Sequence, residues 1–164
     1  MRSTYFLLLI SILLSSKIAS AEIGYIYEHD FNDDGIHDSL MSGPEYLFGN
    51  GGGPFMLRLS KADGTFSEKV IGLHPKVAAL EQNGSNSKIW GYWHMSASEG
   101  VLGYVLLDGS FKQENLRLQF HQSHEGLSSK IYDLVFNENQ IIKFRKVENY
   151  IPPKYEWGLS LIHI

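Results

Sequence analysis

The sequence contains no cysteine among its 164 residues. A disulfide framework is therefore excluded, and so is a lipoprotein anchor attached to a cysteine. Basic residues are also outnumbered, because 14 Lys and Arg stand against 18 Asp and Glu, and the formal net charge is −4 at pH 7. This balance argues against nucleic acid or an anionic membrane surface as the main partner.

The sequence also lacks an apolar run long enough to span a bilayer comfortably. Its main apolar run, residues 6–14, follows Arg2 and leads into Ala19-Ser20-Ala21. A basic start, a short apolar stretch and small residues before a cut are typical of a cleaved secretory signal. We therefore expect residues 1–21 to be a signal peptide and the protein to be secreted or periplasmic, with no membrane anchor. The alternative is a buried N-terminal helix.

A long helical periodicity is the third absence. Short stretches rich in β-branched and aromatic residues instead alternate with turn residues such as Asp63-Gly64, Asp108-Gly109 and residues 137–139. This pattern predicts that residues 22–164 form a single all-β domain of antiparallel hairpins, with an extended C-terminal tail from about residue 149. The expected strands are residues 23–28, 39–41, 55–59, 66–71, 77–80, 88–95, 100–107, 111–113, 115–121, 130–136 and 141–147.

One stretch that is present, HDFNDDGIHD at residues 29–38, places four Asp and one Asn around a single glycine. Counted from Asp30 as position 1, side-chain oxygens occur at positions 1, 3, 5 and 9, and glycine at position 6 allows a sharp bend. Hard oxygen donors in this number suit Ca²⁺ better than Mg²⁺, which requires stricter octahedral geometry. The predicted ligands are Asp30, Asn32, Asp34, Asp38 and the backbone carbonyl of Ile36. The alternative is a solvated acidic turn without a metal.

Position 12 of this loop is Met41 rather than a bidentate Glu, so the loop is not an EF-hand. The longer stretch DFNDDGIHDSLMSG…FGNGGGPFMLRLSKADGTFSEKV, within residues 27–70, resembles one FG-GAP or VCBS-type repeat. The resemblance implies the same calcium ligands, a structural role for the metal and a blade-like sheet. A propeller needs about four or more blades, and the sequence has one such loop. We therefore expect a small sandwich or open barrel, not a full propeller.

Several other groups of residues are candidates for binding or chemistry. The alternating strand at residues 88–95 places Trp90, Tyr92 and His94 on one face, and Trp90 and Tyr92 are candidates for stacking on a sugar, although strand aromatics also serve as core. His121 and His124, with His94, lack the further ligand of a zinc site. The glycine-rich residues 49–54 lack the Lys and Ser/Thr of a phosphate cradle, and we expect a conformationally free loop there.

The pair Ser96 and Ser98 lies near His94 but has no nucleophile elbow around it. We therefore expect a non-catalytic, calcium-binding domain, a binding or inhibitor module for an extracytoplasmic protein. The alternatives are a carbohydrate or cell-wall binding module that uses Trp90 and Tyr92, and an enzyme with an unrecognised site.

Overall fold

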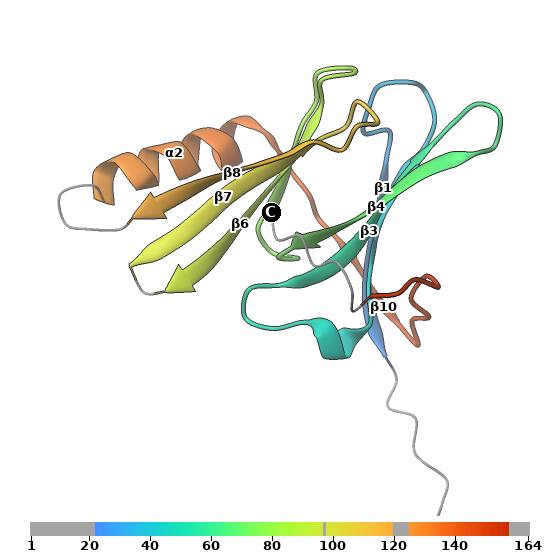
Figure 1. Cartoon of the computed structure of the whole chain (residues 1–164), viewed down its shortest axis with the longest axis horizontal. Coiled ribbons are helices and arrows are strands. Elements are labelled where there is room, and N and C mark those ends of the chain that lie inside the picture. The colour runs from blue at the N-terminus through green and yellow to red at the C-terminus, as the bar shows by residue number, and fades with distance from the viewer. Residues whose placement is uncertain (1–21, 97, 120–124, 158–164) are drawn as a thin grey trace, which may run out of the picture.

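The computed structural model describes residues 22–96, 98–119 and 125–157. Within these ranges the chain forms two five-stranded antiparallel sheets and one α-helix of 14 residues (Figure 1). The predicted all-β class is confirmed, and neither of the two described sheets closes into a barrel. Among the described residues, no helix has both the length and the apolar character needed to cross a membrane. The predicted signal peptide lies outside the described residues, as do His121 and His124.

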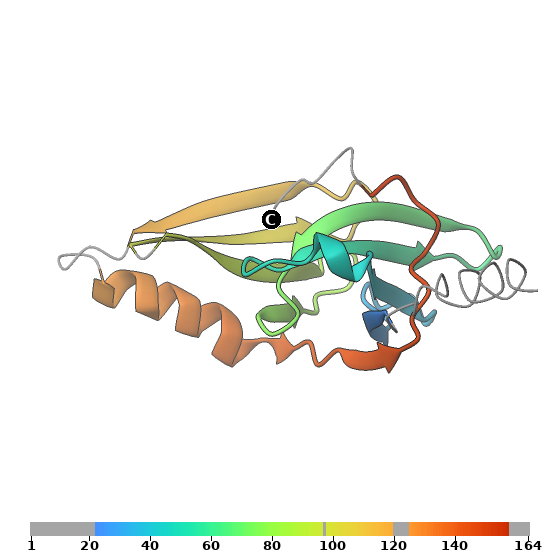
Figure 2. The same ribbon diagram turned by 90° about the horizontal axis from the view of Figure 1, so that it is seen from below.

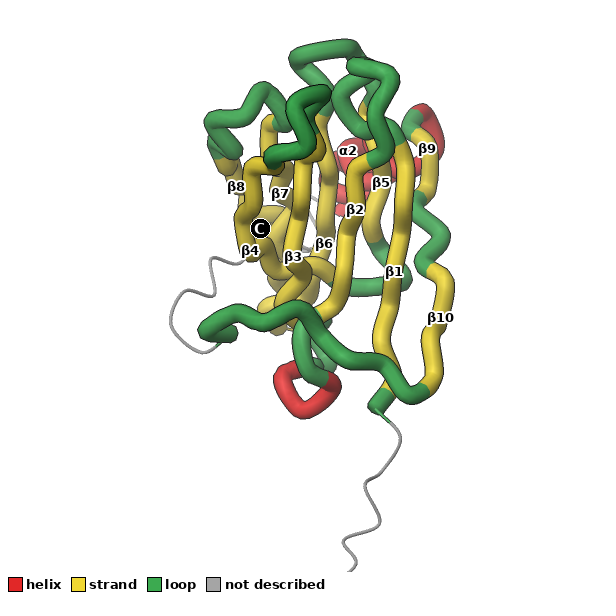
Figure 3. Tube along the Cα trace, turned by 90° about the vertical axis from the view of Figure 1, so that its right-hand side faces the viewer, coloured by secondary structure: helices red, strands yellow, loops and turns green. Residues whose placement is uncertain are grey.

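Sheet 1 has the strand order β10-β1-β2-β3-β4, and Figure 3 shows it in front of the second sheet. The first four of its strands in the sequence form a meander, in which each strand pairs with the next. The Asp63-Gly64 turn joins the last two of them, as predicted, and Gly64 has the positive φ of +80° that such a turn requires. The strands are β1 (Ile23–His29), β2 (Asp38–Ser42), β3 (Gly53–Ser60), β4 (Phe66–Leu73) and β10 (Arg145–Glu148). A short 3₁₀ helix, η1 (Glu45–Leu47), lies between β2 and β3.

Sheet 2 has the strand order β8-β7-β6-β5-β9. The strand predicted at residues 111–113 is wrong, because Phe111 has a φ of +51° and turns its ring into the core. The chain re-enters the sheet only at Gln113. The strands are β5 (Ala78–Glu81), β6 (Lys88–Ser96), β7 (Glu99–Leu106), β8 (Gln113–Gln119) and β9 (Gln140–Ile141).

The main hydrophobic core lies between the two sheets. Every second residue of a strand points to the same face, so one row from each sheet meets the other. Sheet 1 contributes Leu40, Phe55, Leu57, Leu59, Ile71 and Leu73, and sheet 2 and its turns contribute Ala78, Leu80, Ile89, Val105, Leu107 and Phe111. The arrangement is therefore a sandwich, one of the architectures that the sequence predicted.

Residues 130–136 do not form the predicted strand, and residues 137–139 do not form a hairpin turn. Residues 130–138 belong to helix α2 (Glu125–Glu138), which lies along the outer face of sheet 2 (Figure 2), and Asn139 follows its last turn. Ile131, Tyr132, Val135 and Phe136 follow helical spacing and pack on this face. Their β-branched and aromatic side chains favour a strand locally, but the apolar face of sheet 2 requires a cover, and tertiary packing overrides the local preference.

The C-terminal segment, residues 149–157, crosses the outer face of sheet 1. The ring of Tyr150 lies against Gly24 in β1, and its hydroxyl donates a hydrogen bond to the carbonyl oxygen of Ser42 over 2.7 Å. Trp157 is buried against Met56 and Val70. Both sheets are thus covered on their outer faces, sheet 2 by α2 and sheet 1 in part by this segment.

Candidate functional site

The acidic loop (residues 30–38) follows β1, includes the first residue of β2, Asp38, and curls around the carboxylate of Asp30. The Oδ1 atom of Asp30 accepts a hydrogen bond from the amide of Asp34 (3.1 Å), and its Oδ2 atom accepts one from Gly35 (2.8 Å). Asp34 Oδ1 in turn accepts the amide of Ile36 over 2.8 Å. Two residues adopt positive φ values, Asp33 at +59° and Gly35 at +84°. Asp is among the residues that tolerate this conformation, so the local sequence suits the tight curve.

Asn32 lies inside this curve and carries an unsatisfied atom. Its Nδ2 group donates a hydrogen bond to Asp34 Oδ2 over 3.0 Å. Its Oδ1 atom is inaccessible to solvent and has no hydrogen-bond partner. A buried acceptor without a donor is costly, and a hard cation is a partner that an amide oxygen readily accepts.

Asp38 is the most buried member of the predicted ligand set, with 1% of its surface exposed. Its Oδ2 atom accepts the amide of Phe31 (3.0 Å), and its Oδ1 atom accepts the amide of Ser60 at the end of β3 (2.8 Å). Burial raises the pKa of its carboxyl group; the two amides oppose this effect, and the charges of Asp34 and Asp30 add to it. Asp38 therefore connects the acidic loop to β3 and carries a charge that the folded protein disfavours.

A second contact holds the loop against sheet 2. The Nε2 group of Gln82, just after β5, donates hydrogen bonds to the carbonyl oxygen of Asp30 (3.0 Å) and to Asp33 Oδ1 (2.6 Å). Beside the loop is a crevice of about 290 Å³ that Asn32 and Asp34 line together with Ser60 and Asp108. The exposed carboxylate of Asp34 can therefore be reached from this crevice, whereas the Oδ1 atom of Asn32 is buried behind it.

The loop fits Ca²⁺ in its donor chemistry. Asp30, Asn32, Asp34, Asp38 and the carbonyl of Ile36 all offer hard oxygen atoms, and a carboxylate oxygen that accepts one amide keeps a second lone pair. In the described part of the chain, no three His, Asp or Glu side chains lie close enough together to coordinate a metal ion. The carboxylates instead accept amide groups of the loop and its neighbours. An ion bound at this loop would therefore have to share these carboxylate oxygens with the amides or displace the amides.

The raised pKa of Asp38 predicts a pH effect in metal-free protein. A carboxyl whose pKa is higher in the folded than in the unfolded state adds stability at low pH, and this stability is lost as pH rises through the folded pKa. In EDTA, wild type should therefore gain stability relative to Asp38→Asn as pH falls from about 7 towards the ordinary Asp pKa of about 4. Urea unfolding of both proteins at several pH values measures the difference. A difference in stability between the two proteins that stays constant with pH would contradict the raised pKa of Asp38.

The structure separates the two aromatic residues of the predicted sugar platform. Tyr92 is 7% exposed and meets Tyr132 of α2 edge to face, with ring centroids 5.2 Å apart. Trp90 is half-buried, and its ring centroid lies 4.7 Å from that of Tyr104. The two faces of β6 were predicted correctly, but α2 covers Tyr92, so these rings do not form a flat exposed platform.

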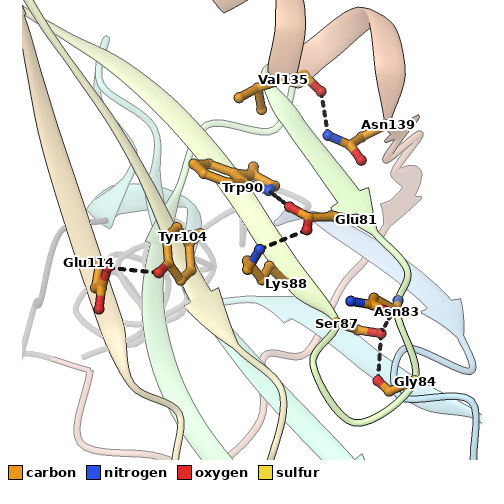
Figure 4. A network of polar contacts seen from close by, with 10 residues as sticks. All are labelled: Glu81, Asn83, Gly84, Ser87, Lys88, Trp90, Tyr104, Glu114, Val135 and Asn139. Atoms are coloured by element: carbon orange, nitrogen blue, oxygen red, sulfur yellow. Dashed lines mark hydrogen bonds and ion pairs between the residues drawn. The ribbon is translucent and has the colours of Figure 1, made fainter. Parts of the chain in front are cut away.

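Trp90 instead lines a cleft of about 700 Å³ between α2 and sheet 2, which we call the α2 cleft. Figure 4 shows the polar contacts at its edge. Trp90 Nε1 donates to Glu81 Oε2, and Lys88 Nζ contacts Glu81 Oε1, both over 2.7 Å. The lining residues are Glu81, Trp90, Leu102, Tyr104, Glu114, Asn115, Leu116, Ile131, Leu134, Val135, Glu138 and Asn139. The sequence interpretation missed this cleft because it missed the helix that forms one wall.

Different partners lower the pKa values of two carboxyl groups in the cleft, those of Glu81 and Glu114. Burial favours the neutral form of Glu81, but the hydrogen bonds from Lys88 and Trp90 outweigh burial and lower the pKa of its carboxyl. Lys112 lies 2.6 Å from Glu114, and the hydroxyl of Tyr104 donates to the same carboxylate over 2.7 Å. The hydrogen bonds from Lys112 and then from Tyr104 lower the pKa of Glu114. Both carboxylates are therefore ionised at neutral pH.

The remaining candidates lie elsewhere. The hydroxyls of Ser96 and Ser98 are exposed and 3.4 Å apart, and the side chain of His94 is outside what the structure describes. The glycine-rich residues are not a free loop: Gly49 and Gly52 exchange two backbone hydrogen bonds of 2.8 and 3.0 Å. The free-loop prediction is wrong because these paired amides close a tight turn.

Comparisons with family models, with curated proteins and with solved structures give no match to this chain. The likeness of residues 27–70 to an FG-GAP or VCBS-type repeat therefore stays a prediction from the sequence.

Proposed function

We propose that the protein is a non-catalytic, secreted or periplasmic binding domain whose acidic loop binds Ca²⁺. The observation that carries this proposal is the buried Oδ1 atom of Asn32, which lacks a partner inside a loop of oxygen donors. Asp30, Asn32, Asp34, Asp38 and the carbonyl of Ile36 would hold the ion. The ion supplies positive charge that offsets the repulsion among the carboxylates and the burial of Asp38.

The role we assign to calcium is structural. Asp38 of the loop accepts a hydrogen bond from Ser60 in β3. Gln82, in the segment that follows β5, donates a hydrogen bond to Asp33 of the loop. An ion that fixes the loop therefore fixes a junction between the two sheets. The likeness to calcium-stabilised repeats supports the same role.

Calcium should raise the thermal stability of the protein by several degrees over its value in EDTA. A ligand that binds only the folded state adds about 2.7 kcal/mol at a hundredfold excess over its Kd. Asp34→Ala should abolish the calcium response, because the carboxylate of Asp34 is one of the proposed ligands. Since Asp34 is exposed, the variant should still fold. Differential scanning calorimetry in EDTA, Ca²⁺ and Mg²⁺ measures this.

Asp63→Ala is the matched control. Asp63 also precedes a glycine with positive φ, in the exposed turn between β3 and β4, so its loss should leave the calcium response intact. If millimolar Ca²⁺ shifts the melting temperature of neither wild type nor control, the loop is only an acidic turn and the proposal fails.

The partner we propose is an extracytoplasmic protein, which the domain binds or inhibits. Affinity capture from periplasm or culture fluid, with calcium and with EDTA, tests this: a single stoichiometric partner retained only with calcium is the expected result. A carbohydrate or cell-wall partner is the lesser candidate, because Tyr92 is covered by α2 and only Trp90 of the predicted pair faces a cleft. If the protein binds to a glycan array and Trp90→Phe reduces this binding, a carbohydrate becomes the favoured partner.

A further inference from the structure

We propose that the α2 cleft binds a small amphipathic cation, a molecule with an apolar body and one positively charged end. This site is separate from the calcium loop, since none of residues 30–38 lines the cleft. The inference therefore goes beyond the proposed calcium-dependent function and does not depend on it.

The cleft has room and apolar surface for the body of such a ligand. Its volume of about 700 Å³ falls in the range of roughly 300–1,000 Å³ that is common for small-molecule sites. Leu102 and Trp90 belong to the sheet, and Ile131 and Val135 belong to the helix. At the rim, Leu116 and Leu134 remain 49% and 58% exposed. Apolar surface is thus left uncovered between β8 and α2, and a ligand would remove it from water.

The carboxylates of the cleft favour a ligand whose polar end is positively charged. Glu81, Glu114 and Glu138 line it, whereas no Lys or Arg is among those of its lining residues that the structure describes. Lys88 and Lys112 offset the first two carboxylates from outside the lining. Glu138 has no ion-pair partner among the residues that the structure describes. The charge that remains without an ion-pair partner among the described lining residues is therefore the negative charge of Glu138.

The end of α2 adds to this negative charge. The last turn of the helix contains no basic residue, and Val135, Glu138 and Asn139 of this end line the cleft. The C-terminus of a helix carries partial negative charge, which favours a cation nearby. The ammonium group of Lys88 lies 5.9 Å from the centroid of the Trp90 ring and 5.3 Å from that of the Tyr104 ring, so a cation of the protein already lies at this part of the cleft. The charged end of the ligand would therefore lie at Glu138 and the end of α2.

The sheet side of the cleft is also held in place before any ligand binds. The indole of Trp90 is bonded to Glu81, and the phenol of Tyr104 is bonded to Glu114, as Figure 4 shows. The two rings contact each other across neighbouring strands. Since these side chains are already ordered, a ligand would not have to immobilise them, which favours binding.

Three probes of one shape test the proposal: 4-phenylbutylamine, which is cationic at pH 7, the neutral 4-phenylbutan-1-ol and the anionic 4-phenylbutyrate. Isothermal titration calorimetry of the purified protein, in EDTA and in Ca²⁺, should show the amine binding at least about threefold more tightly than the alcohol. The carboxylate should bind most weakly. Equal affinities, a preference for the carboxylate, or no binding of the amine at millimolar concentration would each overturn the proposal. Binding in EDTA keeps this result distinct from the outcome for the calcium loop.

A matched pair of variants locates the site. Leu134→Lys places a cation at the rim and should weaken amine binding about tenfold or more. Asn137→Lys makes the same charge change on an exposed position of the same helix that does not line the cleft, and it should change affinity less than twofold. Both positions are exposed, so both proteins should fold, which circular dichroism checks. Equal losses in the two variants would show a general charge effect and overturn the assignment to the cleft.

Glu138→Gln tests the charge separately from the shape. It should weaken the amine about threefold and leave the alcohol unchanged, because only the cation responds to the carboxylate. If the amine and the alcohol respond equally, the carboxylate does not recognise the charged end, and the proposed ligand class is wrong.

Discussion

Replacing Asp38 by alanine should lower the free energy of unfolding by about 3 kcal/mol in metal-free protein. The carboxylate is 1% exposed and accepts the amides of Phe31 and Ser60. Truncation leaves both amides without their partner, and a buried unsatisfied donor costs about 1–3 kcal/mol. Removal of the charge offsets part of this loss, since burial disfavours the ionised form. Urea denaturation in EDTA measures the change.

Asp108→Ala is the control for this experiment. Asp108 also accepts two hydrogen bonds, from the amide and hydroxyl of Ser110, but in an exposed turn where water replaces the lost partners. Its loss should cost less than about 1 kcal/mol. Similar losses for the two variants would show that the burial of Asp38 does not set the cost.

Replacing Gly52 by alanine should cost about 3 kcal/mol or more. Gly52 has a φ of +95°, which an L-residue adopts only with strain. A Cβ atom at this position would also collide with the backbone carbonyl of Leu73 at the end of β4, and this backbone is fixed by pairing with β3. Neither cost can be relieved by rotation of a side chain. Thermal or urea unfolding of the variant measures the loss.

Gly51→Ala provides the comparison one residue away. A Cβ atom there meets no atom within 4 Å, and Gly51 is not among the described residues with positive φ. The substitution should be neutral or raise stability by up to about 1 kcal/mol, because alanine restricts the unfolded chain. A large loss at Gly51 and a small one at Gly52 would contradict the turn geometry described above.

The strands and turns were largely predictable because their signals are local. Asp63-Gly64 and Asp108-Gly109 mark turns through the positive φ of their glycines, at +80° and +85°. Alternation along β6 assigned Ile89 and Trp90 to opposite faces correctly. What alternation does not tell is what covers each face: here sheet 1 covers one face and α2 the other.

The helix was missed because its apolar residues satisfy two patterns at once. Ile131-Tyr132 and Val135-Phe136 are β-branched and aromatic pairs, as in strands, yet the two pairs are also four residues apart, as on one face of a helix. The α2 cleft was hidden with the helix. In the acidic loop, by contrast, the candidate ligands follow from spacing alone. The partners of this loop that are distant in the sequence, Gln82 and Ser60, could not be predicted from spacing, because only the fold brings them near the loop.

The pairing of β1 with β10, Ile23 opposite Glu148, has a consequence for how fast the protein folds. Sheet 2 has the same property, since β5 pairs with β9 across the whole of residues 82–139. Neither sheet acquires its last edge strand until the chain beyond α2 has been made, and closing such long loops slows folding. Until then β1 and β5 present open hydrogen-bonding edges, and a chain stopped after α2 would expose both of them to pairing with another copy.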